Sequence, residues 1–197
     1  MLPELLVATH NAGKVREIRQ ALGETVVRLR MQAEVPGAPP PAEETGATYR
    51  ENALLKANAL ALATGLPSMA DDSGLEVAAL GGRPGVHSSR YGSHDAERIA
   101  RLLSELSSVA GAPARAARFV CTVALVLPGR KPVFFEGTVG GTILETSRGS
   151  NGFGFDPVFL VEGLDRTMAE LPLEQKNRIS HRARALSAMR AWLAAGG

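Results

Sequence analysis

Cysteine and long apolar runs are scarce in this sequence. Cys121 is the single cysteine among 197 residues, so the chain cannot form an internal disulfide or a zinc site built from cysteines. No apolar run approaches the roughly 20 residues that a membrane-spanning helix requires. Residues 1–9 lack the basic start and apolar stretch of a secretory signal. We therefore expect a cytoplasmic protein that does not enter a membrane.

Net charge, aromatic residues and lysine are also scarce. The formal net charge is +2 and aromatic residues make up 5% of the chain, so we expect no nucleic-acid partner. Only four of the 22 basic residues are lysines. Three of them, Lys14, Lys56 and Lys176, lie in or beside the polar segments described below. Because a lysine ammonium is a compact charge that arginine does not always replace, this distribution suggests a metal–polyphosphate site, and a coincidental placement of so few lysines is the alternative.

Apolar periodicity predicts a mixed α/β chain in which strands and helices alternate before a final pair of strands. The expected strands are 5–9, 26–29, 68–70, 117–127 and 133–139. The expected helices run from about residue 15 to Gly23, over 48–64 with a capping box at Thr48 and Glu51, over 95–106, and through a long C-terminal helix whose apolar stripe extends from Ile179 to Leu193. The prolines at 36–41 predict a loop that could separate two lobes.

The first expected strand ends in a polar turn, Thr9-His10-Asn11-Ala12-Gly13-Lys14. Backbone N–H groups and the positive end of the helix dipole meet at such a strand-to-helix turn, where they can bind an anion. The segment lacks the Walker A pattern. A helix cap followed by a solvated lysine is the alternative, and this turn taken alone favours it.

Two adjacent carboxylates follow the expected strand 68–70, within Asp71-Asp72-Ser73-Gly74. Neighbouring side chains of an extended strand point in opposite directions, so we expect a tight turn here that lets both carboxylates serve one site. Carboxylates at a strand end suit Mg²⁺, and a solvated surface turn is the alternative. Glu43 and Glu44 could add a carboxylate, but taken alone they indicate a charged loop.

Aromatic and glycine residues alternate in Gly152-Phe153-Gly154-Phe155-Asp156-Pro157. Glycines let the backbone approach a flat ligand, and an aromatic ring can stack on a base; a turn with core aromatics is the alternative. Lys176 and the run Ser180-His181-Arg182 lie near the expected C-terminal helix. Taken alone, His181 is more typical of a structural histidine than of a catalyst.

In this order, the segments resemble the inosine triphosphate pyrophosphatase family, also called XTP/dITP diphosphatases. The matching segments are 9–14, 43–46, 51–53 with Lys56, 70–75, 82–91, 152–157, and Lys176 with 180–182. They span nearly the whole chain, and the ordered set is specific although each segment alone is weak. His10 and Phe155 depart from the pattern, since the family often has a small residue and a tyrosine at these positions.

The resemblance implies a single two-lobed domain over residues 1–197, with a long twisted central sheet flanked by helices and a nucleotide cleft between the lobes. It implies a homodimer that uses Mg²⁺ to hydrolyse the triphosphates of inosine, deoxyinosine and xanthosine. The products are the nucleoside monophosphate and pyrophosphate, formed when water attacks the α-phosphorus. A non-catalytic nucleotide-binding regulatory module, or a pyrophosphatase for other modified nucleotides, is the alternative.

The resemblance also assigns roles to residues of this chain. Glu44 and Asp72 would hold Mg²⁺ with Asp71 close by, and Asp72 would also accept a proton from the attacking water. His181 and Arg182 would donate hydrogen bonds to the 6-oxo group of the purine. The residues expected to bind substrate are Thr9, His10, Asn11, Ala12, Gly13, Lys14, Lys56, Ser73, Phe153, Gly154, Phe155, Asp156, Lys176, His181 and Arg182.

Overall fold

A computed structural model describes residues 2–22 and 28–196 as a mixed α/β structure with one six-stranded sheet in the order β2-β1-β3-β4-β5-β6. The strands are β1 (Leu5–Val7), β2 (Leu29–Met31), β3 (Ser68–Val77), β4 (Ala116–Val126), β5 (Val133–Ile143) and β6 (Phe159–Val161). The α-helices are α1 (Ala12–Leu22), α2 (Tyr49–Thr64), α3 (Asp95–Glu105), α4 (Leu173–Ile179) and α5 (His181–Ala194). β1 is parallel to β2 and β3, whereas β6 is antiparallel to β5. The predicted mixed α/β class is confirmed.

The chain divides into two compact units. The first unit comprises 1–72, 121–137 and 182–197, and the second comprises 73–120 and 138–181. Strands β3, β4 and β5 each contribute residues to both units. The boundary expected at the prolines of 36–41 is wrong, because that segment lies entirely within the first unit.

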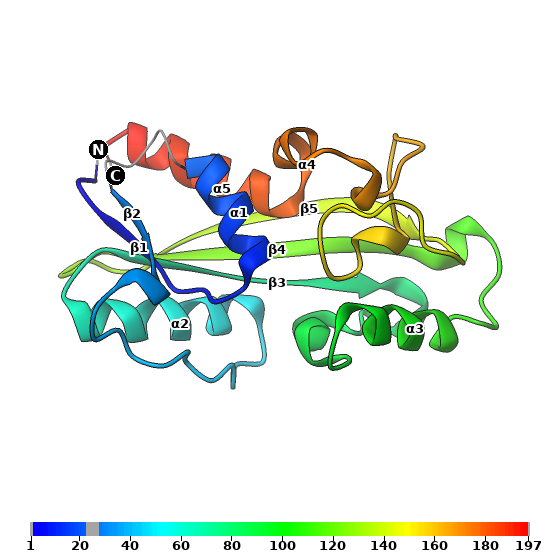
Figure 1. Ribbon diagram of the computed structural model, residues 1–197, viewed down its shortest axis with the longest axis horizontal. Coiled ribbons are helices and arrows are strands. Elements are labelled where there is room, and N and C mark those ends of the chain that lie inside the picture. The colour runs from blue at the N-terminus through cyan, green and yellow to red at the C-terminus, as the bar shows by residue number, and fades with distance from the viewer. Residues whose placement is uncertain (1, 23–27, 197) are drawn as a thin grey trace. The chain divides into compact units, whose positions relative to one another are not determined.

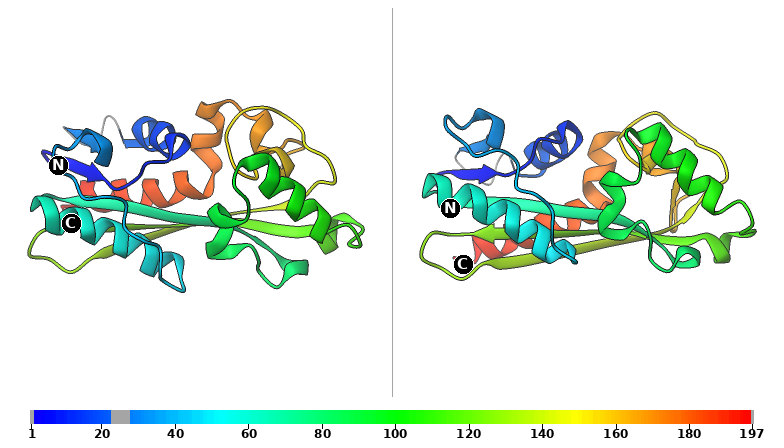
Figure 2. Two further views of the ribbon diagram at one scale, coloured as in Figure 1. Left: turned by 60° about the horizontal axis from the view of Figure 1, so that its bottom comes forward. Right: turned by 90° about the horizontal axis from the view of Figure 1, so that it is seen from below.

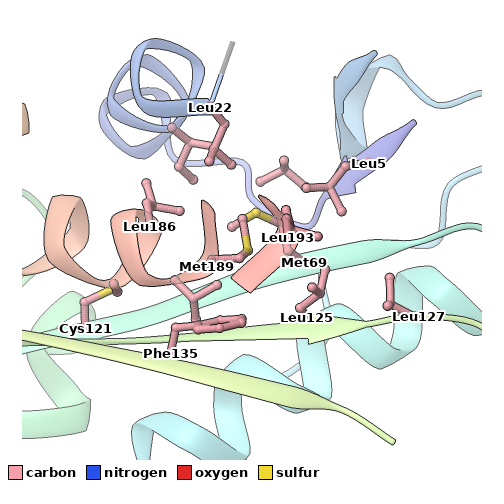
Figure 3. Packing of buried hydrophobic residues seen from close by; sticks show 14 of the residues in the cluster. Leu5, Leu22, Met69, Cys121, Leu125, Leu127, Phe135, Leu186, Met189 and Leu193 are labelled. Carbon is pink, nitrogen blue, oxygen red and sulfur yellow. The ribbon is translucent and has the colours of Figure 1, made fainter. Parts of the chain in front are cut away.

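In the first unit, strand residues alternate between two apolar cores. Leu5 and Val7 of β1 pack in the core that α1 and α5 cover, whereas Leu6 packs in the core that α2 covers. Figures 1 and 2 show α1 and α5 on one side of these strands and α2 on the other, and Figure 3 shows the first of the two cores. Because successive strand side chains point to opposite faces, both faces of β1 and of the first-unit part of β4 are expected to be largely apolar, as the sequences of 5–7 and 121–126 are.

The second unit has one core that β3, β4, β5, β6 and α3 share. Phe119 of β4 tilts over Phe159 of β6 with 4.4 Å between ring centroids, and Leu102 of α3 is fully buried in the same cluster. The buried guanidinium of Arg115 donates hydrogen bonds to four backbone carbonyls, those of Leu106, Val109, Ile143 and Leu144. Arg115 therefore ties the end of α3 to the end of β5.

The predicted helix α2 and the predicted pairing of β4 with β5 are confirmed. Helix α2 has the expected capping box, in which the Thr48 hydroxyl accepts from the Glu51 N–H at 3.1 Å and the Glu51 carboxylate accepts from the Thr48 N–H at 3.0 Å. β4 and β5 are adjacent in the sheet and joined by a short connection, as expected for a hairpin. Gly23, Val26 and Val27, part of the predicted helix end and second strand, lie outside the described residues, and β2 begins at Leu29.

Two further predictions are wrong. Asp71–Gly74 is not a turn but the middle of β3, which runs unbroken from Ser68 to Val77. The C-terminal helix is not continuous, since Ser180 has an extended backbone (ψ 158°) between α4 and α5. The apolar stripe serves two cores as a result: Ile179 packs in the core of the second unit, and Leu186 packs in the first. No described helix is both long and apolar enough to cross a membrane.

Candidate active site

Helix α2 holds two carboxylates together in the first unit. The Lys56 ammonium donates to Glu44 Oε1 at 2.7 Å and to Asp72 Oδ1 at 2.9 Å. One turn earlier on α2, the Asn52 side-chain amide donates to Asp72 Oδ2 at 3.3 Å, and its oxygen accepts from the Gly46 N–H at 2.8 Å. A Cβ at Gly46 would lie 2.6 Å from the Cβ of Glu51, so only glycine allows this loop to approach the helix.

The environments of Glu44 and Asp72 shift their acidities in opposite directions. Burial and the charge of Glu44 raise the pKa of Asp72, against the attraction of Lys56. Burial would also raise the pKa of Glu44, but its attraction to Lys56 outweighs burial and lowers that pKa. Burial would lower the pKa of Lys56, yet the surrounding carboxylates raise it. Lys56 therefore stays an ammonium, and Asp72 is the carboxylate that accepts a proton more readily.

The side chain of Asp71 lies on the opposite face of β3 from that of Asp72. Its Oδ2 lies 2.9 Å from Lys14 Nζ and 3.0 Å from Arg182 Nη2, and Arg182 also forms a buried ion pair with Glu17 of α1. Burial would raise the pKa of Asp71, but the charges of Lys14 and Arg182 hold it well below its usual range. The structure thus brings Glu44 and Asp72 together and places Asp71 apart from them, because adjacent strand side chains alternate.

The polar turn 9–14 lies at the carboxyl end of β1. β1 is parallel to β3 with Val7 opposite Met69, so the turn leaves β1 beside the stretch of β3 that carries Asp71, and Lys14 reaches that carboxylate. The Asn11 side-chain oxygen accepts from the Lys14 N–H at 3.0 Å and caps α1, and Thr9 Oγ1 accepts from the Asn11 N–H at 3.2 Å. His10, Asn11 and Ala12 are exposed and Gly13 is buried. The predicted order of strand, polar turn and helix is confirmed, and the residues at the start of the helix are exposed.

In the second unit, the loop 152–156 is folded around a carboxylate. Asp156 accepts from the Phe153 N–H at 2.9 Å and forms a buried ion pair with Lys176, whose ammonium lies 4.8 Å from the centroid of the Phe153 ring. A Cβ at Gly152 (φ +79°) would lie 2.0 Å from Asp156 Oδ2, so glycine is required there. Phe155 is buried in the core, edge-on to Tyr91 at 6.4 Å, and does not present an open face to a base.

Of the remaining expected residues, His181 and Arg182 are the first two residues of α5, and Ser73 lies on β3. His181 is 5% exposed and stacks on Phe119 with 4.8 Å between centroids. Arg182 is 1% exposed, with its guanidinium directed at Asp71 and Glu17. Ser73 is half-buried on β3. Two buried carboxylates of the first unit, Asp71 and Glu17, therefore hold the charge of Arg182.

Comparison with known proteins decides the family. The model of the Ham1 family matches residues 5–192. This chain belongs to the Ham1 family. Curated relatives named dITP/XTP pyrophosphatase include those of Geobacillus kaustophilus (49% identical, covering 94% of this chain and 92% of the relative) and Deinococcus radiodurans (50%, 94% and 90%). The solved structure of a HAM1 protein from Coxiella burnetii is 41% identical, with a TM-score of 0.87, covering 98% of this chain and 99% of that one.

Sequence reasoning on this Ham1 chain missed several residues that the site uses. Asn52 lies in the matching segment 51–53 but was given no role, and Glu17 was not singled out, although each is a polar residue on the buried side of its helix. For Asn52 a signal existed, because it lies four residues before Lys56 and so on the same helix face. Glu17 offered no such signal, since its partner Arg182 is 165 residues away.

Proposed function

We propose that this Ham1-family chain hydrolyses non-standard purine nucleoside triphosphates, dITP, XTP and ITP, to the monophosphate and pyrophosphate. Similarity over nearly full length to relatives named dITP/XTP pyrophosphatase supports the reaction. The observation that carries the proposal is the pair Glu44 and Asp72, held together by Lys56 and Asn52. A regulatory module would need no carboxylate kept ready to accept a proton, so that alternative is not favoured.

The accessible turn before α1 is the proposed phosphate site. The start of α1 offers backbone N–H groups and the positive end of the helix dipole. Thr9 and Asn11 use side-chain oxygens in their local hydrogen bonds, which does not consume their O–H and N–H donors. Lys14 adds a positive charge beside Asp71. This arrangement can bind and orient a triphosphate.

Two carboxylates and a neighbouring phosphate site fit Mg²⁺, which takes one or two carboxylates together with waters and substrate phosphates. Within the described residues no group of three or more His, Cys, Asp or Glu side chains is arranged to hold a metal, so a site closed by protein ligands alone is not proposed. Glu44 and Asp72 would hold the ion. When bound, Mg²⁺ would offset negative charge on the triphosphate.

Asp72 is the proposed proton acceptor. It would take a proton from a water molecule whose oxygen bonds to the α-phosphorus, while the bond from that phosphorus to the oxygen bridging the α- and β-phosphates breaks. The raised pKa of Asp72 suits this task, because a base works best when its pKa approaches the operating pH. Lys56 and Asn52 would orient the carboxylate, and pyrophosphate would leave.

Residues of the second unit would bind the base. The Phe153 ring, held by Asp156 and Lys176, is the proposed stacking surface. His181 is the proposed donor to the 6-oxo group; Arg182, the second donor that the resemblance implies, is paired with Asp71 and Glu17 in this structure. A purine with a 6-amino group would leave such a donor unpaired, which disfavours ATP. From the family resemblance we also propose a cytoplasmic homodimer.

The test is release of pyrophosphate from ITP, XTP, dITP, GTP, ATP and dUTP, with and without Mg²⁺. We expect Mg²⁺-dependent turnover of the first three and little of the others. Asp72→Asn should lower kcat by about 10²–10⁴-fold while ITP still binds. Asp165→Asn, at a side chain that is 97% exposed, is the matched control. Turnover by Asp72→Asn at the wild-type rate would remove Asp72 from the mechanism.

A further inference from the structure

Asp95, the first residue of α3, reaches the aromatic–glycine loop from a distant part of the chain. Its Oδ2 accepts from the Gly154 N–H at 2.7 Å, although the two residues are 59 positions apart. Its other oxygen, Oδ1, lies 2.6 Å from Arg98 Nη1. Arg98 Nε also donates to the Gly92 carbonyl at 3.1 Å, so the carboxylate is held in place.

Two carboxylates therefore fix consecutive N–H groups of the loop. Asp156 accepts from Phe153 at 2.9 Å, and Asp95 accepts from Gly154 at 2.7 Å. Gly154 has φ +64°, and a Cβ built there would meet nothing within 4 Å. The backbone has an unusual conformation at this point and borders open space. The hydrogen bond from the Gly154 N–H to Asp95 of α3 therefore helps to hold the loop in this conformation.

A second contact links the same segment to the loop. Tyr91, four residues before Asp95, meets the Phe155 ring edge-on at 6.4 Å, and the Arg101 guanidinium of α3 lies 4.2 Å from the centroid of the Tyr91 ring. Segment 91–95 thus supports the loop twice, once at a backbone N–H and once at a buried ring. Phe153, the residue before Gly154, donates its N–H to Asp156, and the Lys176 ammonium lies 4.8 Å from the centroid of its ring.

We propose that Asp95 is a positioning residue for recognition of the purine base. This inference rests on the proposed function, in which Phe153 contacts the base. By holding Gly154, Asp95 fixes the backbone that carries the Phe153 ring. It contacts none of the residues proposed to bind phosphate, so its removal should weaken base binding and leave phosphate binding and the chemical step intact.

The experiment compares Asp95→Ala with two matched variants. Asp95→Asn keeps an oxygen that can accept from Gly154, and Glu97→Ala removes another carboxylate from the first turn of α3 that bonds to Ser93 instead of the loop. For each we measure KM and kcat for ITP, and the inhibition constant of inorganic tripolyphosphate, which has no base. Hydrogen exchange of a peptide covering 150–158 reports the loop directly.

We expect Asp95→Ala to raise KM for ITP about tenfold. This ratio corresponds to the low end of the free energy that a hydrogen bond to a charged group contributes. Its kcat and its inhibition by tripolyphosphate should stay within about twofold of wild type, and exchange in 150–158 should accelerate. Asp95→Asn should restore most of the affinity, and Glu97→Ala should match wild type.

Three results would overturn the inference: an unchanged KM in Asp95→Ala, an equal loss of affinity for tripolyphosphate, or no rescue by Asp95→Asn. Failure of the proposed function is separate, because it would appear in the wild-type protein as absence of pyrophosphate release. In that case the variants are compared by calorimetry with ITP. Base-dependent weakening in Asp95→Ala would then still support the positioning role, and no wild-type binding would overturn it.

Discussion

Asp71→Asn should destabilise the first unit strongly, because it removes one charge from a buried ion cluster. We define this cluster as Lys14, Glu17, Asp71 and Arg182. The side chains of Asp71, Arg182 and Glu17 are 0%, 2% and 3% exposed, and that of Lys14 is 15% exposed. Two positive charges balance two negative ones, so the substitution leaves an uncompensated positive charge in the interior.

The magnitude follows from this burial. Removing one partner of a buried ion pair typically costs about 3–5 kcal/mol, and asparagine has nearly the shape of aspartate, so little of the loss would come from a cavity. The exposed pair Arg178 and Glu174 on α4, whose side chains are 72% and 69% exposed, supplies the control. Glu174→Gln should cost less than about 0.5 kcal/mol.

Urea unfolding followed by tryptophan fluorescence suits this test. Trp192 is the only tryptophan in the chain, and it packs edge-on to Phe135, 6.0 Å away, in the core of the first unit. The double variant Asp71→Asn/Arg182→Met should lose less free energy of unfolding than the sum of the two single variants, because the second change removes the unpaired charge.

A loss below about 1 kcal/mol in Asp71→Asn would refute the reasoning, as would strictly additive effects in the double variant. If Asp71→Asn does not fold, Glu17→Gln provides the same test with a smaller loss. Arg182 then keeps its contacts with Asp71, which its Nε and Nη2 reach at 3.1 and 3.0 Å.

Three further predictions concern stability. The pKa of Asp71 is lowered in the folded state, so its charge stabilises the fold fully at pH values above the pKa of an unfolded aspartate, about 3.9. The free energy of unfolding that Asp71→Asn loses relative to wild type, measured by urea unfolding, should therefore be constant near neutral pH and become smaller below about pH 4. Thr48→Ala should cost about 1 kcal/mol in the same assay, because it removes the cap of α2. Leu125→Ala should cost about 2–5 kcal/mol, since this fully buried side chain lies in the core of the first unit.

Elements whose cause is local were predictable from the sequence. The ends of α2 depend on Thr48 and Glu51 at one end and on Gly65, with φ +69°, at the other. All of these signals lie within a few residues of the helix end that they determine. The same holds for the turn 9–14, where Asn11 caps α1 through the N–H of Lys14, three residues on.

Elements determined by distant partners were not predictable. The polar run Asp71–Gly74 contains residues that favour turns, yet β3 continues through it because each carboxylate meets cations on its own face. For Asp71 these are Lys14, 57 residues away, and Arg182, 111 residues away. Asp95 illustrates the same limit at the loop 152–156, since nothing near it in sequence indicates Gly154 as its partner.

The two adjacent aspartates of β3 show how position alone can divide chemical roles. Asp71 meets Lys14 and Arg182, which lower its pKa, so it stays charged and stabilises the fold. Asp72 is buried beside Glu44, which raises its pKa and makes it the better base. Because Asp72→Asn leaves Lys56 paired with Glu44, no cation there becomes unpaired. We therefore expect Asp72→Asn to lose turnover with little loss of stability, whereas Asp71→Asn should lose stability first.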